Sequence, residues 1–188
     1  MIPSELLLQG YRLGVFPMAM DDGTIEWFSP DPRAILPLDA FHVPHALRQL
    51  IRKKAFEIKI DSRFGEVLRC CAKRKDTWIN TEIIESYEAL HKLGCAHSVE
   101  AWSENQLAGG LYGVAIGGAF FGESMFHRET NASKIALVAL VEHLRAKKFA
   151  VLDTQWITPH LKQFGAIEIS RDHYLRLLRR AIELPRQF

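Results

Sequence analysis

The sequence has few cysteines, no long apolar run and little net charge. Its 188 residues include three cysteines, and Cys70 and Cys71 are adjacent, which is a poor basis for disulfides and indicates a reducing compartment. No stretch reaches the roughly 18 apolar residues of a membrane-spanning helix. Residues 1–10 carry Glu5 and lack the basic start and apolar core of a signal peptide. We therefore expect a cytoplasmic protein without a membrane segment.

A metal site or a cysteine nucleophile is also not indicated. His42 and His45 have ligand-like spacing, but no cysteine or acid in a recognisable pattern accompanies them. The cysteines lie on apolar segments, which is typical of core packing. The net charge of +2 excludes a strong overall field, so any RNA contact has to be a local basic patch.

The stretch from Gly109 to Gln155 predicts a strand hairpin, a helix and a further strand. Two apolar runs, Gly109–Ala115 and Ala119–Glu123, flank two glycines, which favours a hairpin. Ala132–Lys148 has no proline or glycine and suits a helix, with Asn131 as its N-cap. Phe149–Leu152 is an apolar run too short for a helix.

A strand–helix–strand crossover almost always makes its two strands parallel neighbours. Ligands favour the crevice outside the carboxyl ends of such strands. Glu123 would end the first strand and Asp153 the second, and Gln155 would face the same side as Asp153 if the strand continues. We expect these three polar groups to converge at one sheet edge. The alternative is that Asp153 caps a turn and that Glu123 is solvated.

The rest of the chain predicts a mixed α+β fold. The pattern favours helices at 44–54, 64–72, 81–93, 158–164 and 172–183, and strands at 34–36, 56–60, 99–102 and 166–169. A polar turn is expected at residues 21–23. The order resembles the GCN5-related N-acetyltransferase fold, with a four-strand antiparallel core and a crossover helix. We expect two units, a small N-terminal lobe at 1–33 and a catalytic domain at 34–188.

Eight ordered motifs resemble the leucyl/phenylalanyl-tRNA–protein transferases of bacteria, from about Gly10 to Tyr174. The motifs are Phe16-Pro17, Trp27-Phe28-Ser29-Pro30-Asp31-Pro32-Arg33, Thr77-Trp78-Ile79, His97-Ser98-Val99-Glu100, Gly109-Gly110-Leu111-Tyr112-Gly113, Gly122-Glu123-Ser124-Met125-Phe126, Asn131-Ala132-Ser133-Lys134 and Asp153-Thr154-Gln155. The resemblance implies transfer of leucine or phenylalanine, and of methionine as a further candidate, from aminoacyl-tRNA to proteins with N-terminal Arg or Lys. Such transfer marks the acceptor for degradation.

The resemblance also implies an acetyltransferase-like fold that works without coenzyme A. Acetyltransferases of this fold bind the coenzyme pyrophosphate on a glycine-rich loop before the central helix. The corresponding residues, 127–131, contain no glycine and include Glu129. We therefore expect no cofactor. Many family members carry an extra N-terminal segment and a tryptophan where this chain has Met18, so we expect a reduced N-terminal lobe.

By resemblance, Asp153 and Gln155 form a relay that positions the acceptor amine, and Glu123 is an active-site acid that helps to hold the acceptor. The amide oxygen of Gln155 can accept a hydrogen bond from the amine. The residues expected to line the aminoacyl pocket are Trp78, Tyr87, Leu111, Phe120, Met125, Leu137, Leu140, Leu152 and Met18. For each of these apolar residues, ordinary core packing is the alternative.

The resemblance places tRNA on local positive charge. Arg48, Arg52, Lys53 and Lys54 fall within seven residues on a predicted helix, and we expect them to contact tRNA phosphates. A solvated helix face is the alternative. We expect a monomer. Two other functions remain open: an acetyl-coenzyme A-dependent N-acetyltransferase, and a catalytically silent adaptor for tRNA or N-terminal peptides.

Overall fold

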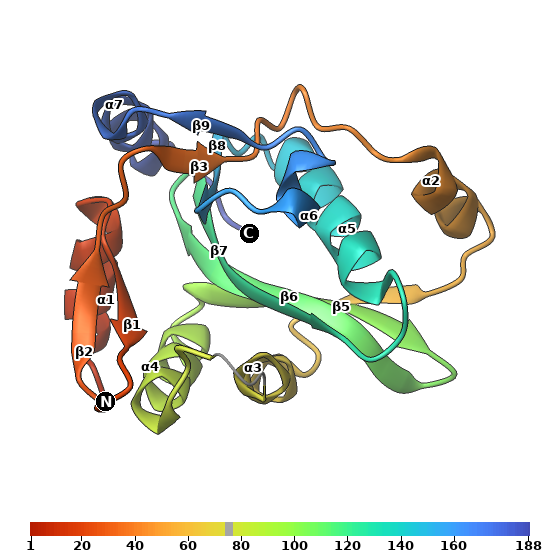
Figure 1. Cartoon of the computed structure of the whole chain (residues 1–188), viewed down its shortest axis with the longest axis horizontal. Coiled ribbons are helices and arrows are strands. Elements are labelled where there is room, and N and C mark those ends of the chain that lie inside the picture. Colours follow the sequence, from red (N-terminus) through yellow and green to blue (C-terminus); the bar gives the residue numbers. More distant parts are fainter. Residues whose placement is uncertain (74–76) are drawn as a thin grey trace.

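The computed structural model describes residues 1–73 and 77–188, which form a mixed α+β fold around a seven-stranded sheet (Figure 1). β4–β7 make the predicted antiparallel core, β8 pairs with β7 in parallel, and β3 lies between β8 and β9. In sheet order the strands are β4 (Glu57–Ile60), β5 (Ala96–Ser103), β6 (Gln106–Ile116), β7 (Ala119–His127), β8 (Val151–Gln155), β3 (Arg33–Ile35) and β9 (Ile167–Ile169).

Helices cover both faces of this sheet, and the buried side chains form one apolar cluster on each face. One cluster includes α3 (Phe64–Ala72), α4 (Thr81–Lys92) and α7 (Arg171–Ile182). The other contains α5 (Ala132–Ala146) and α2 (His45–Arg52), with the short α6 (Pro159–Lys162) beside them. Phe120 and Phe121, neighbours on β7, point to opposite clusters, as alternation along a strand requires.

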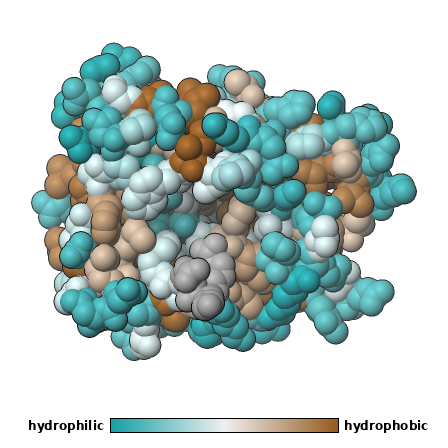
Figure 2. All heavy atoms as spheres, in the orientation of Figure 1, coloured by the Kyte–Doolittle hydropathy of each residue, from teal (hydrophilic) through white to brown (hydrophobic). Residues whose placement is uncertain are grey.

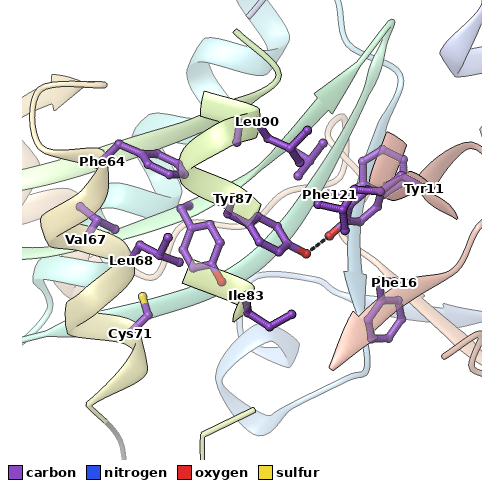
Figure 3. Packing of buried hydrophobic residues seen from close by; sticks show 14 of the residues in the cluster. Tyr11, Phe16, Phe64, Val67, Leu68, Cys71, Ile83, Tyr87, Leu90 and Phe121 are labelled. Atoms are coloured by element: carbon purple, nitrogen blue, oxygen red, sulfur yellow. Dashed lines mark hydrogen bonds between the residues drawn. The ribbon is translucent and has the colours of Figure 1, made fainter. Parts of the chain in front are cut away.

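A small N-terminal lobe packs against the α4 side of the sheet. It contains α1 (Ser4–Arg12) and an antiparallel hairpin of β1 (Phe16–Ala19) and β2 (Ile25–Phe28). Gly14 follows α1 with φ +80°, a conformation that glycine adopts without strain. Figure 3 shows Tyr11 of α1 against Phe121 and next to Tyr87 of α4, so the lobe shares the core of the large sheet. The turn at 21–23 was predicted, but the two short strands were not.

The crossover β7–α5–β8 confirms the predicted parallel pair, but the predicted end of its first strand was wrong. β7 continues to His127, so Glu123 lies within the strand and does not end it. Asn131 precedes α5 in a left-handed conformation, with φ +70°, and its side chain makes no capping hydrogen bond. Asn131 thus occupies the predicted N-cap position without the side-chain hydrogen bond of a usual cap.

Two of the remaining sequence motifs contribute to folding. Glu100, fully buried on β5, accepts hydrogen bonds from the Ser98 hydroxyl, the Trp102 indole and the backbone N–H of Arg63. It thereby fixes the chain that leads into α3. Cys70 and Cys71 are buried in the apolar cluster, as predicted. Among the described residues, no helix has the length and apolar character needed to span a membrane.

Candidate active site

The site begins where the parallel strands β7 and β8 separate. Only three residue pairs join them, and the last pair is Phe121 with Asp153. Directly afterwards each strand carries an extra residue: Glu123 is skipped in the pairing of β7 with β6, and Thr154 in the pairing of β8 with β3. Such bulges bend a strand and redirect side chains. The two bulges therefore open the sheet at the edge where the sequence predicted a crevice.

A cavity of about 920 Å³ fills the opening between the strands. This volume lies in the range of small-molecule sites. Seven of the nine predicted pocket residues line the cavity: Met18, Trp78, Leu111, Met125, Leu137, Leu140 and Leu152. Tyr87 and Phe120 do not, and both are fully buried. Tyr87 points from α4 into the polar network described below, and Phe120 packs against Phe188 behind the cavity.

Gln155 reaches the cavity because its backbone leaves the regular strand conformation. Its φ is +57°, a left-handed value that is uncommon for a residue other than glycine. The carboxylate Oδ1 of Asp153 holds this turn by accepting the backbone N–H of Gln155 at 2.9 Å. The amide Nε2 of Gln155 donates to Glu123 Oε1 at 3.3 Å. Because Nε2 is directed at Glu123, the amide oxygen is left for a ligand.

Asp153, Glu123 and Gln155 thus converge, as predicted, but Asp153 does not line the cavity. The sequence predicted that Gln155 would share a side with Asp153 if the strand continued, but the backbone of Gln155 leaves the regular strand conformation in a left-handed turn. Thr154, the bulge residue, lines the cavity beside Gln155. Among the described residues, its buried hydroxyl has no hydrogen-bond partner.

Behind the cavity, Asp153 forms a fully buried ion pair with Arg33. The guanidinium donates to both carboxylate oxygens, at 2.9 and 2.6 Å, and also to the carbonyl of Gly14 at 3.1 Å. The Tyr174 hydroxyl donates to Asp153 Oδ2 at 2.6 Å. Arg33 lies between the rings of Phe16 and Tyr174, with its central carbon 4.9 and 4.5 Å from their centroids. These contacts satisfy the carboxylate on all sides and fix its position.

Glu123 is buried among tyrosines. The Tyr11 hydroxyl donates to its Oε1 at 2.8 Å, and a short hydrogen bond joins the Tyr11 and Tyr87 hydroxyls (Figure 3). The Tyr87 hydroxyl also lies 3.3 Å from Oε2 of Glu123. Burial raises the pKa of Glu123 to about 8, and the negative charge of Asp153 adds to this rise, while the tyrosine hydrogen bonds and Arg33 oppose it. Glu123 is therefore a carboxyl group that holds its proton near neutral pH.

Sequence reasoning missed several residues of this network. Arg33 was part of a family motif but had no assigned role, Tyr174 was assigned only to a helix, and Tyr11 was not singled out. A buried arginine is stable only beside a buried acid. To predict that Asp153 is the partner of Arg33, one must know that β3 lies beside β8. The sequence does not specify that β3 inserts there, 120 residues away along the chain.

The predicted basic patch is exposed but separate from the cavity. Arg48, Arg52, Lys53 and Lys54 are all exposed on or just after α2. α2 lies on the outer side of α5, away from the N-terminal lobe (Figure 1), and hydrophilic residues dominate that end of the surface in Figure 2. Two aromatic residues do line the cavity: Trp156, 44% exposed, packs edge-on against Phe16, with ring centroids 5.1 Å apart.

Comparisons with known proteins agree with the resemblance drawn from the motifs. The family model "Leucyl/phenylalanyl-tRNA protein transferase" matches residues 35–179, and the model of its N-terminal domain matches residues 2–31. A leucyl/phenylalanyl-tRNA–protein transferase of Akkermansia muciniphila is 55% identical over 184 residues, 95% of each chain. The protein of that name from Herpetosiphon aurantiacus is 53% identical and covers 98% of this chain and 96% of its own length.

Solved structures show a more distant likeness. A conserved protein of unknown function from Staphylococcus epidermidis aligns with 90% of this chain and 65% of its own, at 12% identity and a TM-score of 0.49. That score is too low for an argument about fold or function. The family models and the relatives above 50% identity, by contrast, extend over nearly the whole sequence. The chain therefore belongs to the leucyl/phenylalanyl-tRNA–protein transferase family of aminoacyltransferases.

Proposed function

We propose that the cavity holds the aminoacyl ester of a leucyl- or phenylalanyl-tRNA and that the α-amine of a protein with N-terminal Arg or Lys attacks it. The observation that carries the proposal is the position of Gln155. Its amide is held between Asp153 and Glu123, and its oxygen is left for the cavity. Methionine is a further candidate donor, and the transfer marks the acceptor for degradation.

The apolar part of the cavity suits an uncharged side chain. Leu111, Met125, Leu137, Leu140 and Leu152 form its wall, and no described residue among its lining other than Glu123 carries a carboxylate. An apolar pocket separates side chains by only about 1–3 kcal/mol per methylene, so leucine and phenylalanine can share it. Desolvation without a partner excludes charged side chains. Met18 and Trp78 also line the cavity and add apolar surface for the aminoacyl group.

The reaction needs no covalent intermediate, because the donor ester is already activated. The amine nitrogen forms a bond to the ester carbonyl carbon, the bond to the ribose oxygen breaks, and the amine proton ends on that ribose oxygen. A free α-amine has a pKa of about 7.7–8, so roughly a tenth is neutral at pH 7 and no strong base is required. Gln155 accepts a hydrogen bond from the amine and aims its lone pair.

Three neighbours support this step from different sides. Asp153 acts as a positioning residue, because it binds the backbone of Gln155 and is shielded from the cavity by it. Glu123 orients the Gln155 amide. The unpartnered Thr154 hydroxyl is suited to donate to the carbonyl oxygen as negative charge develops there. The basic residues of α2, Arg48 to Lys54, contact tRNA phosphates in this proposal.

The acetyltransferase-like fold, the division at residue 33 and a cytoplasmic monomer belong to the same proposal. The order of β4–β7 followed by α5 and β8 supports the fold. The separate sheet of β1 and β2 supports an N-terminal lobe, although Arg33 already belongs to β3 of the large sheet.

The test is a transfer assay with leucyl-, phenylalanyl- and methionyl-tRNA and with peptides that begin with Arg, Lys or Glu. Mass spectrometry should show Arg and Lys peptides heavier by one leucine or phenylalanine residue. An adaptor would bind these partners and yield no product. An N-acetyltransferase would instead acetylate the peptide when acetyl-coenzyme A is added.

A further inference from the structure

The end of the cavity beside the start of α5 is basic. Lys134 in the first turn of α5, His127 at the end of β7 and His160 on α6 all line this end. The residues come from three elements that only the fold brings together. The start of a helix also favours anions, because its backbone dipole is positive there.

No salt bridge among the described residues neutralises this basic end, although Glu129 lies in the loop between His127 and α5. Within the described residues, neither Lys134 nor His127 forms a salt bridge, and the buried Nε2 of His160 lacks a hydrogen-bond partner. Burial lowers the pKa of His160, and its neighbours Lys134 and His127 lower it further, so His160 supplies a neutral imidazole and the fixed charge at this end is that of Lys134. Arg128, at the same end, differs because Glu66 and the Leu107 carbonyl hold its guanidinium.

Unpaired positive charge at the mouth of a cavity is suited to an anion that enters with the substrate. The transferred leucine or phenylalanine brings no anionic side chain. An acceptor with N-terminal Arg or Lys brings positive charge, which these residues repel. The anion available from the donor is the phosphodiester backbone of its RNA. The basic helix α2 lies on the outer side of α5 (Figure 1), and its exposed cations are a second region suited to the same RNA backbone.

We propose that Lys134, with His127 and His160, binds a phosphodiester of the 3′-terminal nucleotides of the aminoacyl-tRNA donor. This inference rests on the proposed placement of the donor ester in the cavity. The contact is to a phosphate, so it adds affinity that falls with salt and does not depend on the base.

The experiment compares two stable donor analogues in which an amide replaces the ester. One is phenylalanine joined to the 3′ position of adenosine, without phosphate; the other carries phenylalanine on a cytidine-cytidine-adenosine trinucleotide. Binding is measured by calorimetry for the full chain, for Lys134→Gln and for Lys134→Arg. The matched control is Lys147→Gln, an exposed lysine at the other end of α5.

Lys134→Gln should weaken trinucleotide binding about fivefold or more and lower the slope of log Kd against log salt by about 0.7, the value for one phosphate on a single strand. Nucleoside binding should stay within about twofold, Lys134→Arg should restore most of the loss, and Lys147→Gln should resemble the unmodified protein. Competition by excess acetyl-coenzyme A for the trinucleotide would reassign the site to coenzyme phosphates and overturn the proposal.

Two further outcomes separate this inference from the proposed function. An equal loss for both analogues, or no loss for either, would refute the phosphate site while the donor cavity stands. Failure of the unmodified protein to bind either analogue would refute the donor cavity itself, and the phosphate site with it.

Discussion

Replacing Arg33 by methionine should destabilise the fold more than any surface change, because it leaves the Asp153 carboxylate buried without its cation. Arg33 is 1% exposed and Asp153 0% exposed, and two hydrogen bonds of 2.9 and 2.6 Å join them. Breaking a buried pair of this kind costs about 3–5 kcal/mol. For a domain of this size, about 2–4 °C of melting temperature corresponds to each kcal/mol, so we expect a drop on the order of 10 °C.

The double variant with Arg33→Met and Asp153→Leu distinguishes the ion pair from simple packing. With both charges gone, the loss should be smaller than the sum of the two single losses by about 2 kcal/mol or more. Transfer activity should be low in the two variants that lack Asp153, since the backbone of Gln155 loses its anchor there. Urea and thermal unfolding measure the stabilities, with the exposed Arg12→Met as control. Single losses below about 1 kcal/mol, the range of surface pairs, would refute the reasoning.

Three further predictions concern the site and the RNA surface. Glu123 has a pKa raised to about 8, so the native state holds a proton that the unfolded chain releases at lower pH, and the stability from this proton is lost as pH rises through about 8. The unmodified protein should therefore lose melting temperature between pH 5 and 9 relative to Glu123→Gln, which cannot titrate at this position. A difference in melting temperature that stays constant over this range would contradict the raised pKa. Thr154→Val, which removes the hydroxyl at nearly constant shape, should lower kcat about tenfold or more with little change in KM, and an unchanged kcat would exclude the hydroxyl from the reaction. Reversing Arg48, Arg52 and Lys53 to Glu should raise the KM for aminoacyl-tRNA about tenfold or more, and an unchanged KM would remove tRNA from α2.

The crossover at the centre of the fold was predictable because its signals are local. The glycine pair at 117–118 predicts the hairpin, and neighbouring residues likewise predict the proline-free helix and the short apolar strand. The parallel pairing then follows from the strand–helix–strand crossover. This was enough to bring Glu123, Asp153 and Gln155 together.

The details that shape the site were not predictable, because they depend on pairing across strands. The bulge at Glu123 exists only relative to β6, and the bulge at Thr154 only relative to β3. Gln155 looks like one more strand residue until its left-handed turn is seen. Tyr87 was predicted to line the pocket because its contact across the fold is not visible in the sequence. Its hydroxyl lies 3.3 Å from the carboxyl group of Glu123.

The most direct test of the account is the effect of Gln155→Ala on transfer from aminoacyl-tRNA to a peptide with N-terminal Arg. If the amide aims the attacking amine, kcat should fall about a hundredfold, the scale of a lost positioning contact, while the KM for the donor changes little. The control Gln106→Ala, at an exposed position on β6, should behave as the unmodified protein does. A kcat for Gln155→Ala within about threefold of the unmodified value would contradict the claim that geometry at this residue drives the reaction.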